Sequence, residues 1–237
     1  SMTGTSIEQA KSSLIYSISQ LKETDGFNII PFESSFTSLT PGTIQATDEN
    51  KKIAFEYINK LNAGGGTEAR PALKFAMDIP NDDNKIKMIL FITDGSVGNS
   101  NQLIDLTKKN LKNARLFTIG IGSAPNSYLL EKISREGRGT FTYISNISQV
   151  SSKVGKLLKK VEAPVLTNIE FKLTDQNADL FPNPIPDLFI DEPLVIFGKV
   201  KNTNSINSEF TGKNNDGYFK IDLPINLDTS EKYPSVS

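Results

Sequence analysis

The 237 residues carry a net charge of −1 and contain 37% hydrophobic and 8% aromatic residues, a globular composition that gives no reason to expect nucleic acid or an anionic membrane as a partner. The absence of cysteine and histidine excludes disulfides, thiolate nucleophiles, Cys/His zinc sites and a histidine-containing catalytic triad. No apolar run approaches the roughly 18–20 residues of a membrane-spanning helix.

The first sixty residues predict two helices with strand-forming segments between them. Thr5 and Glu8 have the spacing of a capping box, and apolar residues then recur at steps of three and four, which predicts a helix over 5–22. The next expected elements are a buried strand at 27–32 (FNIIPF), a short edge segment at 35–45 and a helix at 49–61.

A glycine loop follows in the stretch NAGGGTEARPAL, residues 62–73. Three consecutive glycines end at Thr67, and a helix is expected over 70–77. The run KMILFIT at 87–93 is apolar without alternation, which is typical of a strand covered on both faces, and it ends at Asp94. Further along, we expect helices at 101–112, 128–136 and 149–161, and strands at 115–122 and 140–146.

This alternation of strands and helices predicts the fold class of residues 1–162. Alternating elements form α/β folds: a doubly wound, mostly parallel sheet with helices on both faces. Ligands bind such sheets beyond the carboxyl ends of the strands, and both the glycine loop and Asp94 are expected at that edge.

After Pro164 the helical pattern ends and the charge changes sign. Residues 1–162 hold 20 basic and 16 acidic side chains, net +4, whereas 163–237 hold 6 and 11, net −5. Strands are expected at 165–173, 194–201 and 217–225, so we expect residues 163–237 to form a small β-rich module, part of a β sandwich.

Three short motifs, SMTG at 1–4, GGGT at 64–67 and ITDG at 92–95, resemble the metal-ion-dependent adhesion site of the von Willebrand factor type A domains. With PNPIPDLFIDEPLVIFGK in the tail, the chain looks closest to the branch of the inter-alpha-trypsin inhibitor heavy chains and their bacterial relatives. The resemblance implies that Ser1, Thr67 and Asp94 are metal ligands, for Mg²⁺ or else Mn²⁺ or Ca²⁺. It also implies a non-enzymatic domain that binds a carboxylate of a protein partner, exported, periplasmic or at a bacterial cell surface.

The chemistry of the three residues agrees with that interpretation. Mg²⁺ takes about six oxygen ligands, and neutral hydroxyls with one carboxylate leave part of its charge uncompensated, so that a partner's carboxylate is attracted. The Asp-x-Ser-Gly that opens the family's motif, and the strand before it, are absent from this sequence. We therefore expect residues 1–237 alone to bind divalent metal weakly, or not at all.

Simpler interpretations stay open for each residue. Thr67 is alternatively a helix N-cap, Asp94 a plain turn residue, and Ser1 a terminal residue or part of a cloning tag. At the level of function, the alternatives are a metal-free scaffold and, with less support, a Mg²⁺-dependent phosphohydrolase. Neither a histidine nor the lysine of a phosphate-binding loop is present to support the enzyme.

The tail leads to one expectation about assembly. If residues 163–237 are part of a sandwich, the strands at 165–173 and 194–201 should expose unpaired edges and an apolar face. Exposed edges recruit other strands, so homodimerisation or strand swapping is expected.

Overall fold

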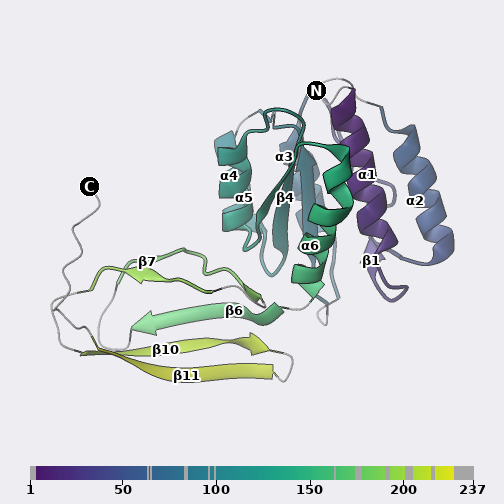
Figure 1. Ribbon diagram of the computed structural model, residues 1–237. Helices are drawn as coiled ribbons and strands as arrows, with labels where there is room; N and C mark the ends of the chain where they lie inside the picture. The colour runs from purple at the N-terminus through teal and green to yellow at the C-terminus, as the bar shows by residue number, and fades with distance from the viewer. Residues whose placement is uncertain are drawn as a thin grey trace. The chain divides into compact units, whose positions relative to one another are not determined.

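The computed structural model describes residues 4–62, 64, 66–82, 85–95, 97–98, 100–162, 164–173, 178–189, 193–200, 205–214 and 217–226 (Figure 1). The chain divides into two compact units, Ser1–Lys159 and Lys160–Ser237. The first holds the helices and a parallel sheet, and the second is made of antiparallel strands.

The parallel sheet of the first unit has the order β3-β4-β5. Its strands are β3 (Met88–Thr93), β4 (Arg115–Ile121) and β5 (Phe141–Ile144). Every residue of β4 is buried, as expected for a central strand with helices on both faces. The α/β class predicted for this part of the chain is confirmed.

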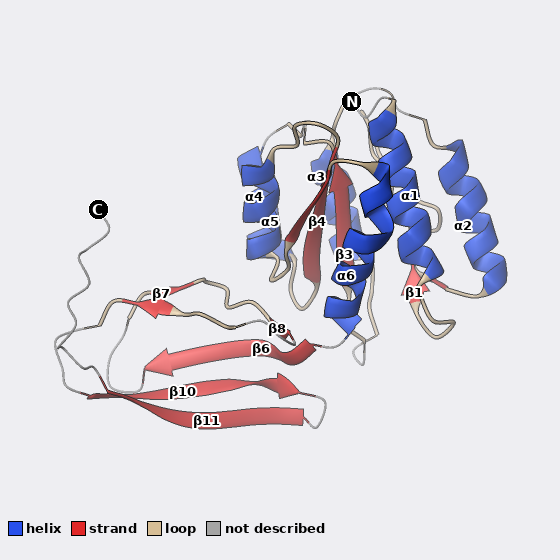
Figure 2. Cartoon of the chain, in the orientation of Figure 1, coloured by secondary structure: helices blue, strands red, loops and turns tan. Residues whose placement is uncertain are grey.

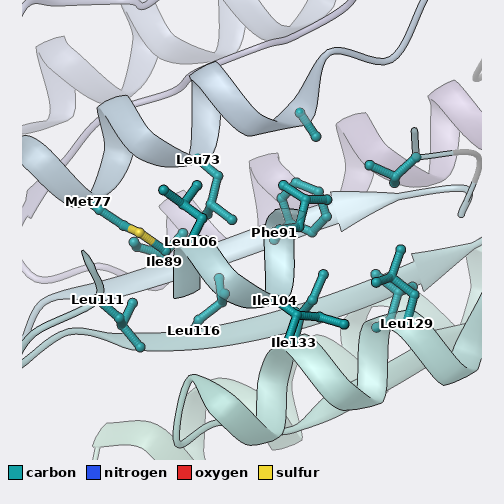
Figure 3. Packing of buried hydrophobic residues seen from close by; sticks show 14 of the residues in the cluster. Leu73, Met77, Ile89, Phe91, Ile104, Leu106, Leu111, Leu116, Leu129 and Ile133 are labelled. Atoms are coloured by element: carbon teal, nitrogen blue, oxygen red, sulfur yellow. The ribbon is translucent and has the colours of Figure 1, made fainter. Parts of the chain in front are cut away.

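Helices cover both faces of this sheet. The helices are α1 (Thr5–Ser19), α2 (Asp48–Lys60), α3 (Ala69–Asp78), α4 (Ser100–Asn110), α5 (Ser127–Glu136) and α6 (Val150–Glu162), the last preceded by the 3-10 turn η1 (Ile147–Gln149). Side chains of α3, α4 and α5 form one hydrophobic core with β3 and β4 (Figure 3). Helices α1 and α6 lie on the opposite side of the sheet from α3 (Figure 2).

The buried strand expected at 27–32 is largely wrong. Only β1 (Gly26–Phe27) forms, and it pairs antiparallel with β2 (Ile44–Gln45), apart from the parallel sheet. The Asn28 side chain donates hydrogen bonds to the carbonyls of Thr40 and Gly42, at 2.9 and 2.7 Å. In a continuing strand, backbone N–H groups would donate to the neighbouring segment instead. Pro31 has no N–H to donate to a ladder, so the apolar run becomes an ordered loop.

The capping box expected at the first helix is also wrong. The N-cap of α1 is Gly4, which has no side chain to accept a hydrogen bond, and Thr5 is already helical. The helix ends at Ser19 rather than residue 22. Gln20 N donates to the Tyr16 carbonyl and Leu21 N to the Ile18 carbonyl, and these hydrogen bonds close the last turn.

The second unit contains a sheet of order β11-β10-β6-β8, in which every pair is antiparallel, and a two-stranded sheet of β7 and β9. The strands are β6 (Pro164–Leu173), β7 (Leu180–Phe181), β8 (Leu188–Phe189), β9 (Phe197–Gly198), β10 (Ser205–Asn214) and β11 (Gly217–Asn226). In Figure 1, β6, β10 and β11 are the long arrows of this unit.

Two sequence expectations about this unit need correction. The edge expected to be unpaired at 165–173 is partly paired, because β6 pairs with β10 on one side and, near its start, with the two residues of β8 on the other. The expected strand at 194–201 shrinks to the two residues of β9 among those described. The long strand β10 was not expected at all, and it occupies the position next to β6.

Within the described part of the chain, no helix is both long enough and apolar enough to cross a membrane.

Candidate metal-binding edge of the parallel sheet

Asp94 lies where the sequence places it, directly after β3 at the carboxyl end of the strand. Its side chain is partly buried, and the next residue, Gly95, has a φ of +92°. A Cβ atom at Gly95 would lie 2.7 Å from Pro125 Cα and closer still to Asn126 N. Asp94 is therefore held on a turn that is packed tightly against the connection leading into α5.

Thr67 lies two residues before α3 and is partly exposed. The N-cap of α3 is Glu68, so Thr67 does not hold the cap position that the simpler interpretation gave it. Among the described residues we find no hydrogen bond from the Thr67 hydroxyl, which leaves this oxygen available to a ligand.

The glycine loop before Thr67 lies along the segment that follows β1. Gly66 N donates to Ser34 Oγ at 2.9 Å, and Glu68 N donates to the Glu33 carbonyl at 2.6 Å. A Cβ atom at Gly64 would lie 3.6 Å from a carboxylate oxygen of Glu33. Glu33 therefore adds a carboxylate beside this loop, which sequence patterns did not indicate because it lies between the strand expected at 27–32 and the edge segment expected at 35–45.

A stacked aromatic pair connects this segment to β3. The rings of Phe32 and Phe91 are parallel within 5°, and their centroids lie 5.5 Å apart. Phe32 immediately precedes Glu33, and Phe91 lies three residues before Asp94. The glycine loop, the 33–34 segment and β3 thus form a continuous set of contacts that leads from the Thr67 loop to the strand that precedes Asp94.

The first turns of α1 reach the same edge of the sheet through Gln9. Its Oε1 accepts from Gly122 N at 2.9 Å, just after β4, and its Nε2 donates to the Ser145 carbonyl at 3.1 Å, just after β5. Gln9 is 3% exposed. Nothing in the local sequence pattern indicated this role for Gln9, because both of its partners lie more than a hundred residues away in the sequence. Figure 2 shows α1 beginning at the end of the sheet to which the β3 arrow points.

The oxygen atoms of Thr67 and Asp94 are of the type that hard divalent cations bind. A threonine hydroxyl and an aspartate carboxylate are oxygen ligands of the type that Mg²⁺, Mn²⁺ and Ca²⁺ prefer. The described residues contain no group of three or more Asp, Glu, His or Cys side chains placed to hold a metal. Ser1, the third predicted ligand, lies outside the described residues. Thr67 and Asp94 would supply only two of the about six oxygen ligands of such a cation.

Comparison with known proteins identifies the family. The family model for the von Willebrand factor type A domain matches residues 1–143. The chain belongs to this family. Domains of this family often mediate protein interactions that depend on a metal ion.

Proteins that contain type A domains match nearly the whole chain. A von Willebrand factor A domain-containing protein of Dictyostelium discoideum is 30% identical over 241 residues, which cover 100% of this chain and 26% of the relative. Human von Willebrand factor A domain-containing protein 5B1 is 27% identical and covers 84% of this chain. The chain spans about a quarter or less of the length of these curated relatives.

Solved structures show the same fold. A von Willebrand factor type A protein from Catenulispora acidiphila superposes with a TM-score of 0.73 at 17% identity, over 95% of this chain and 63% of that one. Proximal thread matrix protein 1 of the mussel byssus, solved with zinc in its adhesion-site motif, gives a TM-score of 0.51 at 16% identity, over 70% of this chain and 44% of that one.

Proposed function

We propose that this type A domain binds a protein partner through a divalent cation held at the carboxyl edge of the parallel sheet. Thr67, Asp94 and Ser1 would supply oxygen ligands, and an acidic side chain of the partner would complete the shell. The observation that carries the proposal is the set of contacts through Ser34, Glu33 and the Phe32–Phe91 pair, which links the Thr67 loop to the strand that precedes Asp94.

The cation would supply an electrostatic contact rather than a reaction. One carboxylate and two hydroxyls neutralise only part of a double positive charge, so the bound ion would attract an anionic partner group. Mg²⁺ is the metal we propose, with Mn²⁺ and Ca²⁺ as the other candidates. The protein would then be a binding domain and not an enzyme.

The domain organisation and cellular location that we propose are based on the resemblance to the same branch of the family. We place residues 1–162 in the type A domain and 163–237 in a β-rich module that belongs to a sandwich. The resemblance to the inter-alpha-trypsin inhibitor heavy chains and their bacterial relatives favours an exported, periplasmic or surface location.

Titration of Mn²⁺ into the 237-residue chain, followed by electron paramagnetic resonance, tests the site because this method detects weak binding. We expect weak binding that falls about tenfold or more in Asp94→Asn, which removes a charged ligand, and several-fold in Thr67→Val, which removes only the hydroxyl. Asp105→Asn, on the exposed face of α4, is the matched control and should leave binding unchanged.

The same titration separates the proposal from a metal-free scaffold. In that second candidate, Thr67 and Asp94 belong to an incomplete site that holds no ion. Equal Mn²⁺ binding by all four proteins would contradict the assigned ligands. No binding by any of them would favour the scaffold.

A further inference from the structure

The outer edge of β11 is a long strand edge to which the proposed metal site assigns no role. Among the described residues β11 pairs only with β10, so its other side presents N–H and C=O groups that no described strand takes up. The strand has ten residues, Gly217–Asn226. A long edge of this kind is a template for pairing with another strand.

The two faces of β11 differ in chemistry. Ile221 and Leu223 lie on one face and are 41% and 40% exposed, although both are large apolar side chains. Lys220 and Asp222 alternate with them and lie on the opposite face. A strand that pairs with this edge must therefore match an apolar row on one face and a charged row on the other.

The charged row has an imbalance at its outer end. Glu209 of β10 lies directly opposite Lys172 of β6 on one side and opposite Asp222 of β11 on the other. Lys220 donates a hydrogen bond to Glu209 and lies 3.9 Å from Asp222, so one ammonium group serves two carboxylates. Like charges directly opposite each other are unfavourable. Asp222, whose side chain is 78% exposed, is thus placed to accept a positive charge from beyond the edge.

We propose that β11 pairs antiparallel with β11 of a second copy of this chain, about a two-fold axis at Ile221. In this register Lys220 of each copy faces Asp222 of the other. Registers centred on Lys220 or on Asp222 would instead place identical charges opposite each other. Among the registers centred on Lys220, Ile221 and Asp222, the alternating charges therefore favour the one centred on Ile221, which pairs two sets of opposite charges.

The remaining side chains agree with this register. Phe219 of each copy faces Leu223 of the other, which buries apolar surface that a single copy leaves in contact with water. Pro224 faces Tyr218 near the ends of the paired stretch, so its missing N–H removes a hydrogen bond there and not at the centre. The interface uses no residue of the proposed metal site, so either proposal can fail without the other.

Disulfide trapping in the full chain tests the axis directly, because the sequence has no cysteine of its own. In Ile221→Cys the two Cα atoms would lie about 4.5–5.5 Å apart across the axis, within the range that a disulfide spans. Leu223→Cys is the matched control, since it has nearly the same exposure and lies on the same face. Its two copies would be separated by about 13 Å along the strands.

We expect mild oxidation to give roughly tenfold more covalent dimer for Ile221→Cys than for Leu223→Cys. Equal yields from the two variants would overturn the register. Sedimentation of the unmodified chain should show a dimer that forms as concentration rises. A monomer at the highest soluble concentration would overturn the association itself.

Charge reversal supplies a second test that also controls for misfolding. Asp222→Lys and Lys220→Asp each place like charges across the axis, and each should weaken association roughly tenfold or more. An equimolar mixture of the two variants restores opposite charges in both pairs and should associate again. Lys172→Gln removes a charged neighbour of Glu209 away from the edge without placing a like charge opposite it, and should leave association intact. Failure of the mixture to associate, with both variants folded, would overturn the proposed pairing.

Discussion

At the scale of single residues, the candidate site depends on a turn whose backbone only glycine adopts easily. Gly95 combines a positive φ with close packing against Pro125 and Asn126, and it follows Asp94 directly. The absence of a side chain at position 95 thus allows the turn that holds the carboxylate of Asp94 at the edge of the sheet.

Gly95→Ala should lower the free energy of unfolding by about 2 kcal/mol or more, because a Cβ atom adds strain at positive φ and collides with the 125–126 backbone. Gly98→Ala is the control, since nothing lies within 4 Å of the added methyl group. Urea unfolding followed by circular dichroism measures both variants. Equal stability of the two would show that the turn relaxes without penalty.

Sequence patterns located the candidate residues better than they located their contacts. The glycine run and the end of an apolar strand singled out Thr67 and Asp94, because these are local signals. Glu33 and Gln9 gave no local signal for their positions. Gln9 reaches the carboxyl edge, and Glu33 reaches the glycine loop, through contacts with residues distant in the sequence that only the folded chain brings together.

At the scale of elements, helix α2 is capped as expected for a good helix start, whereas α1 is not. Thr47 Oγ1 accepts a hydrogen bond from Asn50 N at 3.2 Å, and Asp48 and Glu49 follow in the first turn. Thr5 has the same side chain but sits inside its helix and accepts no such bond as a cap.

Thr47→Ala should therefore lower the free energy of unfolding by about 1 kcal/mol, the usual effect of losing an N-cap. Thr5→Ala should change it by less than about 0.5 kcal/mol, because no capping bond is lost and alanine favours the helix. Thermal unfolding of both variants gives the comparison. A larger loss in Thr5→Ala would indicate a role for Thr5 beyond the helix.

The elements that the sequence predicted are those with long, regular apolar patterns. Strand β3 and the helices from α2 to α6 begin and end within about two residues of their expected bounds, as is usual for pattern-based boundaries. Strand β10 was missed because its inward positions include Ser208 and Gly212. Position 212 requires a glycine because a Cβ atom there would lie 2.7 Å from Leu166. The close packing therefore removes a large apolar residue from the alternating pattern by which a strand is recognised.

At the scale of the whole molecule, each of the two compact units contains fully or almost fully buried apolar side chains of its own. Ile133 of α5 is fully buried in the first unit, and Ile206 of β10 is 1% exposed in the second. Because the described helices all lie within residues 5–162, the helical circular dichroism signal reports almost entirely on the first unit. The two units can therefore be followed separately in one chain.

We expect Ile133→Ala to reduce the stability of the helical transition by about 2–5 kcal/mol, through lost burial and a cavity. Ile206→Ala should leave that transition nearly unchanged, if the units unfold independently. Ile53→Ala, at a site that is 49% exposed, controls for the loss of an isoleucine. A matching shift in Ile133→Ala and Ile206→Ala would show that the two units unfold as one.

The pairing of β10 with β11 also bears on the order in which the second unit acquires its structure. Asn214 pairs with Gly217, so the two strands form a tight hairpin, whereas β6 meets β10 through residues about 40 positions apart, such as Glu170 and Thr211. Hairpins close within microseconds, and distant strands join later because a long loop must first be closed. During synthesis and refolding, the self-complementary edge of β11 should thus exist before β6 is in place, which makes early encounters between incomplete chains the step at which this protein is most exposed to misassembly.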